Sequence, residues 1–309
     1  MSLLREYEYV VAIAKYQNIT KAAESLYVGQ PTLSKFLKTL EDELGVALFR
    51  KSGHKYYPTY AGERYIAKAE QILRLQRDLD HEISDIIERH VGVLRVGFPT
   101  MRCTYMLPCT LPPFREIYPN IKVEITEGPS SELDQKLINS EIDLAFYNQH
   151  SSDDIPMIQS EVLGIEELLI CVPKGHPVGR HAKPNPHSRY PKLDVRYLKN
   201  ETVLMLHESQ RTRRIMDHYL KKQNITFENV MYTNNIPAIM ELIAVGYGVS
   251  FLSEPHIFYH SLEDSIDCDS CGETRMTSAL VVAKRKNSYL PSYANDFIEL
   301  TKRLYIEEQ

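Results

Sequence analysis

The amino-acid sequence predicts a small helical head, one long linker helix and a C-terminal α/β body. Two short amphipathic patterns joined by a Gly-Gln-Pro corner indicate the head, over residues 1–60. An unbroken helical pattern covers residues 61–90, and strand and helix patterns alternate over residues 91–309. The chain has 309 residues, 43% of them hydrophobic and 25% charged, which fits a globular protein of two or three domains.

The head is predicted to be all-α, with three helices. Residues 3–16 form the first, and a second begins at Asn18 or Thr20, either of which can cap it, and runs to about Tyr27. The third helix has a proline in its first turn and a glycine at its end. Its apolar side chains form one stripe, made of Leu33, Phe36, Leu37, Leu40 and Leu44.

A short β-hairpin is predicted directly after the third helix. The stretch RKSGHKYYP has a turn centred on Gly53, with Lys51 before it and His54 and Lys55 after it. The head is therefore interpreted as a winged helix-turn-helix, in which this hairpin is the wing.

Residues 59–89 read as one long helix with a coiled-coil alternation of apolar positions. The positions advance by four and three residues in turn, at Tyr65, Ala69, Ile72, Gln76, Leu79, Ile83 and Ile86. Two interpretations remain open, pairing with a second copy of the chain and packing on the helix's own domain. We favour pairing because the segment is long and separates two otherwise complete domains. The polar Gln76 then has the role of fixing the register.

From residue 91 onwards the pattern predicts an α/β body with largely parallel sheets. The predicted strands are 92–98, 122–128, 142–148, 168–174, 202–206 and 230–235, followed by strands at 248–254 and 277–285. The predicted helices are 107–119, 130–140, 211–224 and 236–246. Residues 176–192, rich in Pro, His and Arg, are predicted to be a loop.

The outer edge of the third helix has the chemistry expected of a helix that enters the major groove of DNA. In a helix-turn-helix, the second helix of the motif places its N-terminal side chains at base edges and cations at phosphates. The residues that fit are Gln30, Pro31, Thr32, Ser34, Lys35 and Lys38, with Lys51 and Lys55 of the wing at the adjacent backbone. Singly, each is more simply a solvated surface residue, so the prediction rests on the combination.

Charge is weakly consistent with that interpretation. Residues 1–60 hold 8 Lys or Arg and 6 Asp or Glu, whereas the whole chain has a net charge of −5. A slightly basic head on an acidic body is compatible with nucleic-acid binding by the head.

The motif AAESLYVGQPTLSKFLKTLEDELGVALFRK resembles the helix-turn-helix signature of the LysR-type transcriptional regulators. The matching positions are Ala22-Ala23, Leu26, Gln30-Pro31, Ser34, Leu40-Glu41, Leu44-Gly45 and Leu48-Phe49. The chain departs from the pattern at Gly29, where the family usually has a serine, and at Lys51, a common arginine position. The segments at 111–146 and 238–254 extend the resemblance along the whole chain.

The resemblance implies a body built like a type 2 periplasmic binding protein, with two subdomains that bind an effector. The expected boundaries are about 91–162 plus 267–309 for the first subdomain and 163–266 for the second. It also implies promoter DNA as a partner, self-association as a homodimer or homotetramer, possible contact with RNA polymerase, and a small, often anionic metabolite as effector. No cofactor is expected.

Effector-binding residues are expected where strands end, because helix N-termini and free N–H groups gather at the carboxyl edge of such sheets. The candidates are Thr100, Met101, Arg102, Ser130, Gln149, His150, His207, Thr233 and Asn234. Helix N-termini and hydroxyls suit a carboxylate, and Arg102 or Arg211 can add a full charge. Local capping is the competing interpretation for Ser130.

Other classes of protein are less compatible with the sequence. No nucleophile elbow, zinc-protease, phosphate-loop or dinucleotide motif is present, so no enzyme activity and no metal site is expected. A solute-binding receptor leaves the head unexplained. Five cysteines, with Cys268 and Cys271 as the one closely spaced pair, leave redox sensing as a minor alternative. No apolar run is long enough to span a membrane and no signal peptide is evident, which predicts a cytoplasmic protein.

Overall fold

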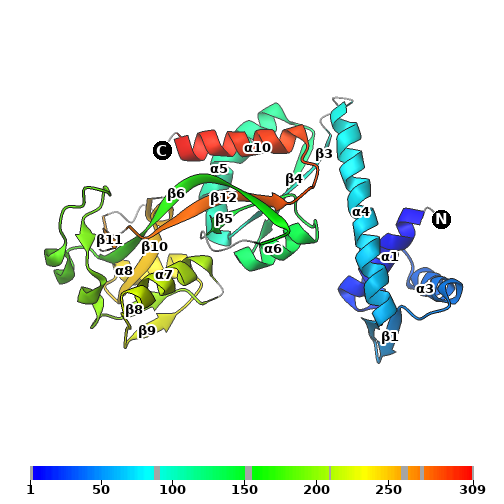
Figure 1. The fold of residues 1–309 in the computed structure, drawn as a ribbon, viewed down its shortest axis with the longest axis horizontal. Coiled ribbons are helices and arrows are strands. Elements are labelled where there is room, and N and C mark those ends of the chain that lie inside the picture. The colour runs from blue at the N-terminus through cyan, green and yellow to red at the C-terminus, as the bar shows by residue number, and fades with distance from the viewer. Residues whose placement is uncertain are drawn as a thin grey trace. The chain divides into compact units, whose positions relative to one another are not determined.

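The computed structural model describes residues 3–86, 91–149, 155–208, 210–258, 264–271 and 275–307. The chain divides into two compact units, Met1–Arg89 and His90–Gln309. Figure 1 shows the head with its long helix as one unit and the α/β body as the other.

The first unit contains the three predicted helices, the hairpin and the long helix. Its elements are α1 (Leu3–Tyr16), α2 (Ile19–Ser25), α3 (Gln30–Leu44), β1 (Phe49–Ser52), β2 (Lys55–Pro58) and α4 (Tyr60–Ile86). Asn18, and not Thr20, caps α2, because its side chain accepts hydrogen bonds from the backbone N–H groups of Thr20 and Lys21. Gly45 ends α3 with φ of 67°, in the left-handed region that favours glycine.

Burial of the apolar stripes holds the head together. Val10, Ile13, Ala22, Leu33 and Leu37 lie in one core with the start of the hairpin. Glu41 of α3 accepts hydrogen bonds from the backbone N–H groups of Leu48 and Phe49, at 2.7 and 2.9 Å, and so fixes the wing to α3. These contacts make α3 and the wing one rigid piece.

The second unit is an α/β body with a sheet of ten strands, eight of them in one path of neighbours and β7 and β11 beside it. The strands are β3 (Gly92–Phe98), β4 (Ile121–Glu127), β5 (Leu144–Gln149), β6 (Ile158–Pro173), β7 (Lys192–Leu193), β8 (Val203–Met205), β9 (Val230–Tyr232), β10 (Val249–Ser253), β11 (Ile266–Cys271) and β12 (Thr277–Arg285). The helices are α5 (Thr100–Ile117), α6 (Ser130–Ile138), α7 (Arg211–Lys222), α8 (Ile236–Ala244), α9 (Glu254–Phe258) and α10 (Ser292–Lys302), with short turns η1 (Pro177–His181), η2 (Val195–Leu198) and η3 (Arg303–Glu307).

The long strand β6 belongs to two subdomains. Its first half pairs with β12, beside β5, β3 and β4, and its second half pairs with β10 and β11. In Figure 1, β6 and β12 run together between the two halves of the body. The pairing of β6 changes from β12 to β10 at Leu168, and β11 pairs with β6 and β7.

The sheets are mixed, whereas the sequence predicted largely parallel ones. Strands β3, β4 and β5 are parallel, and so are β8, β9 and β10, but β6 runs antiparallel to β10, β11 and β12. The sequence shows the strand–helix units that produce parallel pairs. It does not show that one long strand, β6, pairs in both subdomains.

Helices cover both faces of each subdomain's sheet. In the first subdomain, α5 and α10 share one core with Phe98 and Phe146, and α6 packs on the opposite face. In the second, α7 and α8 cover opposite faces. Because both faces are buried, the strands are almost continuously apolar.

Two predicted boundaries are wrong, each for a packing reason. Helix α5 begins at Thr100 and not at residue 107, because Met101, Tyr105 and Met106 are buried in the core and outweigh the helix-breaking tendency of the prolines inside it. Strand β6 begins at Ile158 and not at residue 168, since its first half is largely exposed and lacks a strong apolar pattern.

Candidate functional sites

The predicted groove-facing edge is the exposed edge of α3. Gln30, Pro31, Thr32, Lys35 and Lys38 are exposed, and Ser34 is half-buried. Leu33 and Leu37, on the opposite side of the helix, lie in the core. Gly29 precedes the helix without a side-chain cap, and its carbonyl accepts hydrogen bonds from the backbone N–H groups of Thr32 and Leu33, at 3.0 and 3.2 Å.

The wing carries cations on both strands. Lys51 and Lys55 are exposed, and the Lys51 ammonium lies 5.8 Å from the Tyr56 ring centroid. Arg50, which the sequence reasoning missed, is also exposed and lies over the Tyr57 ring at 5.8 Å. Arg50 and Tyr57 stand at facing positions of the hairpin, and this cation–aromatic pair is the signal that could have identified Arg50.

The apolar positions predicted at coiled-coil spacing along α4, called the seam below, lie in two environments. Tyr65 packs against the head, 6.1 Å from the Tyr7 ring, and Ala69 is buried. Further along, Ile72, Leu79 and Ile83 are exposed, as is Leu75 outside the seam. Gln76 donates a hydrogen bond to Asp80 of the same helix at 2.9 Å. The side chain of Ile86 lies outside the described residues.

The predicted effector residues lie at carboxyl ends of parallel strands in both subdomains. Thr100 is the first residue of α5 after β3, Ser130 is the first of α6 after β4, and Gln149 ends β5. Thr100 is exposed, Gln149 is partly so, and Ser130 and Met101 are buried. His150 lies outside the described residues.

The second subdomain contributes a small polar cluster at its own strand ends. Asn234 accepts a hydrogen bond from the backbone N–H of His207 at 3.1 Å, and the His207 and Tyr232 rings are 6.0 Å apart. The backbone N–H of Thr233 donates to the Met205 carbonyl at 3.0 Å. His207 and Asn234 are exposed, so their polar atoms are accessible to a ligand.

Arg102 forms an ion pair with another residue inside the protein. It is 2% exposed and forms a two-pronged ion pair with Glu166 of β6, with both distances 2.9 Å. Asn148 accepts from Arg102 and donates to Glu166 and Ser278. Burial alone lowers the pKa of Arg102 and raises that of Glu166, but their mutual attraction outweighs burial, and both groups stay charged.

A second buried ion pair joins the two subdomains. Arg211, the first residue of α7, bonds Asp134 of α6 and lies over the Tyr147 ring, with its guanidinium carbon 4.4 Å from the centroid. Tyr147 donates to Asp134 at 2.7 Å. The sequence reasoning missed Asp134. An aspartate inside the buried stripe of α6 was the available signal, because such a carboxylate needs a partner.

The cysteines are all free thiols. Cys171 and Cys268 face each other across β6 and β11. Burial, followed by the neighbouring Cys268, raises the pKa of Cys171 well above its usual value, which disfavours a reactive thiolate there. Among the described residues there is no cluster of His, Cys, Asp and Glu suited to a metal ion. None of the described helices is both long and apolar enough to cross a membrane.

Two family matches cover nearly the whole chain. Residues 4–63 match the bacterial regulatory helix-turn-helix protein, lysR family, and residues 88–305 match the LysR substrate binding domain. The chain therefore belongs to the LysR family of transcriptional regulators, with a helix-turn-helix head and an effector-binding domain.

Similar proteins include named regulators. A probable RuBisCO transcriptional regulator of Thalassiosira pseudonana is 28% identical and aligns over 95% of this chain and 94% of its own. A probable cat1 operon transcriptional activator of Acinetobacter lwoffii is 27% identical over 98% and 95%. Among solved structures, a full-length OxyR variant from Pseudomonas aeruginosa has a TM-score of 0.73 at 23% identity, covering 98% of this chain and 95% of that one. At that identity the likeness concerns the fold.

Proposed function

We propose that this regulator senses a small organic anion in its C-terminal domain and changes its promoter binding in response. The observation that carries the proposal is the gathering of exposed polar groups at the carboxyl ends of parallel strands in both subdomains. Thr100, Gln149, His207 and Asn234 offer hydroxyl, amide and imidazole groups there. Helix N-termini at α5 and α6 add N–H groups that favour negative charge.

The head is assigned the DNA contacts. Gln30 and Thr32 read base edges at the start of α3, Pro31 positions the first turn, and Ser34, Lys35 and Lys38 hold phosphates. Lys51 and Lys55 of the wing contact the adjacent backbone. Full-length CbnR, a structural neighbour with a TM-score of 0.54, was crystallised with its target DNA, which supports this use of the fold.

Self-association is assigned to α4. Ile72, Leu79 and Ile83 expose apolar surface on one side of a 27-residue helix, which a second copy can bury. Two heads on one dimer then read two half-sites. RNA polymerase is a further partner if the regulator activates transcription.

The effector acts through closure of the subdomains. An anion that contacts strand ends of both subdomains binds the closed arrangement better than an open one, and this difference in affinity drives the shift. The Arg211–Asp134 ion pair already joins the two subdomains, so the anion adds to an existing contact.

The test begins with genome-wide mapping of bound DNA, because neighbouring genes indicate the metabolite class. Carboxylates of that class are then titrated into the protein bound to a mapped promoter fragment, with fluorescence anisotropy as the readout. Thr100→Val is expected to leave DNA affinity without effector unchanged and to weaken the effector response about tenfold, as loss of one hydrogen bond to a charged group implies.

Thr104→Val, one turn further along α5 and also exposed, is the matched control and keeps the full response. An unchanged effector response in Thr100→Val contradicts the assignment of the site.

A further inference from the structure

A cavity lies on the body, beside the point where β6 passes from the first subdomain into the second. It has a volume of about 420 Å³, within the usual size range of small-molecule sites. The residues that matter to the argument are Ile165, Glu167, Arg189, Glu254, Phe258 and Arg275. None of them is among the residues predicted to bind the effector, so this cavity is a different place on the molecule.

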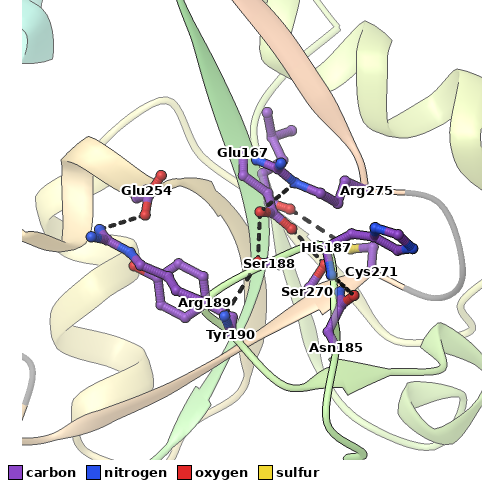
Figure 2. A network of polar contacts seen from close by, with 11 residues as sticks. Glu167, Asn185, His187, Ser188, Arg189, Tyr190, Glu254, Ser270, Cys271 and Arg275 are labelled. Carbon is purple, nitrogen blue, oxygen red and sulfur yellow. Dashed lines mark hydrogen bonds and ion pairs between the residues drawn. The ribbon is translucent and has the colours of Figure 1, made fainter. Parts of the chain in front are cut away.

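The floor of the cavity is a carboxylate whose acceptor positions are in use. Glu167 is 2% exposed and accepts hydrogen bonds from the hydroxyls of Ser188 and Ser270, at 2.8 and 2.5 Å, and from Arg275 Nε at 2.9 Å. Figure 2 shows Glu167 between the Ser188 loop and Arg275. An added cation therefore finds little free capacity at Glu167.

The arginines at the cavity, by contrast, retain donors. Arg275 uses Nε for Glu167, its Nη groups make no hydrogen bond within the described part of the chain, and its side chain is 40% exposed. Arg189 pairs with Glu254 through Nη2 at 2.5 Å and is 61% exposed (Figure 2). A guanidinium has five N–H donors, so both residues can bind a second anion.

The remaining wall is apolar. Ile165 and Phe258 are both exposed large hydrophobic residues, and Pro255 also lines the cavity. Guanidinium donors beside apolar surface suit a molecule with a charged end and an apolar body.

We propose that this cavity binds a small organic anion with an apolar body, as a site separate from the predicted effector cleft. Its lining comes from both subdomains, because Ile165 lies on the first half of β6, and Arg189 and Phe258 belong to the second subdomain. Glu166 also lines it and pairs with Arg102 on α5, the helix that starts at Thr100.

The probe is phenylacetate, which has one carboxylate and an aromatic ring. Isothermal titration calorimetry on the full-length protein compares it with phenylacetamide, of the same shape without charge, and with phenethylamine, of opposite charge. We expect saturable binding of phenylacetate, with both analogues at least tenfold weaker. No binding of phenylacetate at millimolar concentration, or equal or tighter binding of either analogue, overturns the proposal.

Variants locate the binding. Arg189→Ala combined with Arg275→Lys, which keeps a cation beside Glu167, is expected to weaken phenylacetate at least tenfold. Arg189→Ala alone is expected to weaken phenylacetate binding less, and it leaves the hydrogen bonds of Glu167 intact. Arg214→Ala, an exposed arginine of α7 outside the cavity, is the control with unchanged affinity. Thermal unfolding of each variant establishes that it is folded.

Thr100→Val separates this proposal from the proposed function. Phenylacetate binding in the cavity survives Thr100→Val, whereas binding in the cleft is weakened by it. If Thr100→Val abolishes phenylacetate binding and the arginine variants leave it unchanged, the cavity is not the site.

Discussion

At the scale of single residues, Arg102 shows what a local sequence pattern predicts and what it leaves out. A cation just after a predicted strand led to the expectation that Arg102 contacts an anionic effector, whereas the structure pairs it with an anion of the protein itself. The anion is Glu166, 64 residues further along the chain, and both side chains are buried. No spacing in the sequence links the two, because their meeting depends on how α5 packs against β6.

The ion pair makes a stability prediction. Glu166→Gln leaves the Arg102 charge buried without its counter-charge and is expected to lower the free energy of unfolding by roughly 3–5 kcal/mol. Glu161→Gln, on the exposed part of the same strand, is the control, with a change within about 0.5 kcal/mol. Chemical denaturation at neutral pH measures both, and equal stability of the two variants contradicts the role given to the pair.

The same pair predicts a pH dependence. The pKa of Glu166 is lowered in the folded state, so its stabilisation is fully present above the ordinary glutamate pKa of about 4.3 and is lost as the pH falls below it through the folded pKa. Unfolding measured from pH 7 down to pH 3 is expected to show a shallower acid loss in Glu166→Gln than in the wild-type protein. An equally steep loss of stability with falling pH in Glu166→Gln and in the wild-type protein contradicts this prediction.

Two residues of α3 are expected to differ in what they contribute to DNA binding. Lys35→Ala removes a phosphate contact and weakens binding to cognate and random DNA alike, with the log–log salt slope reduced by about one. Gln30→Ala costs about 1–3 kcal/mol on cognate DNA alone, because it removes a base contact. Lys199→Ala, exposed on the body, is the control. Equal losses on cognate and random DNA for Gln30→Ala contradict base reading.

At the scale of elements, the two parts of α4 lie in different environments. Its first turns complete the head, because Ala69 is buried and a Cβ at Gly62 would lie 1.9 Å from the Leu48 carbonyl oxygen. Its later turns leave apolar side chains exposed to solvent. The heptad pattern predicted a single seam, whereas packing divides that seam at about Ile72. The sequence could not place this division, because it depends on where α1 and the hairpin end against the helix.

The exposed half of α4 makes a prediction about self-association. Leu79→Glu places a charge in the apolar seam and is expected to dissociate the dimer, since a buried unpaired charge is costly. Ala67→Glu, exposed on the opposite side of α4, keeps the dimer and is the matched control. Sedimentation velocity gives the two masses. A dimer that persists in Leu79→Glu contradicts the assignment of the seam.

At the scale of the whole molecule, the proposed dimer doubles the DNA contacts, because each copy contributes one head. Counterion release makes log affinity fall linearly with log salt, with a slope proportional to the number of phosphates neutralised. The dissociated Leu79→Glu variant is therefore expected to show about half the slope of the wild-type protein on the same promoter fragment. Anisotropy titrations at several salt concentrations measure it, and equal slopes indicate that one head carries all the contacts.

The sequence by itself determined the order of parts, the three helices of the head, the wing, the exposed edge of α3 and most strands of the body. All of these depend on local propensity and on the period of apolar residues, which neighbours in the chain set. Tertiary structure alone decided that β6 spans both subdomains, that Arg102 and Arg211 meet Glu166 and Asp134, and that a cavity lies beside Glu167. Those features join residues far apart in the chain, and contacts of that kind exist only after the sheets have packed.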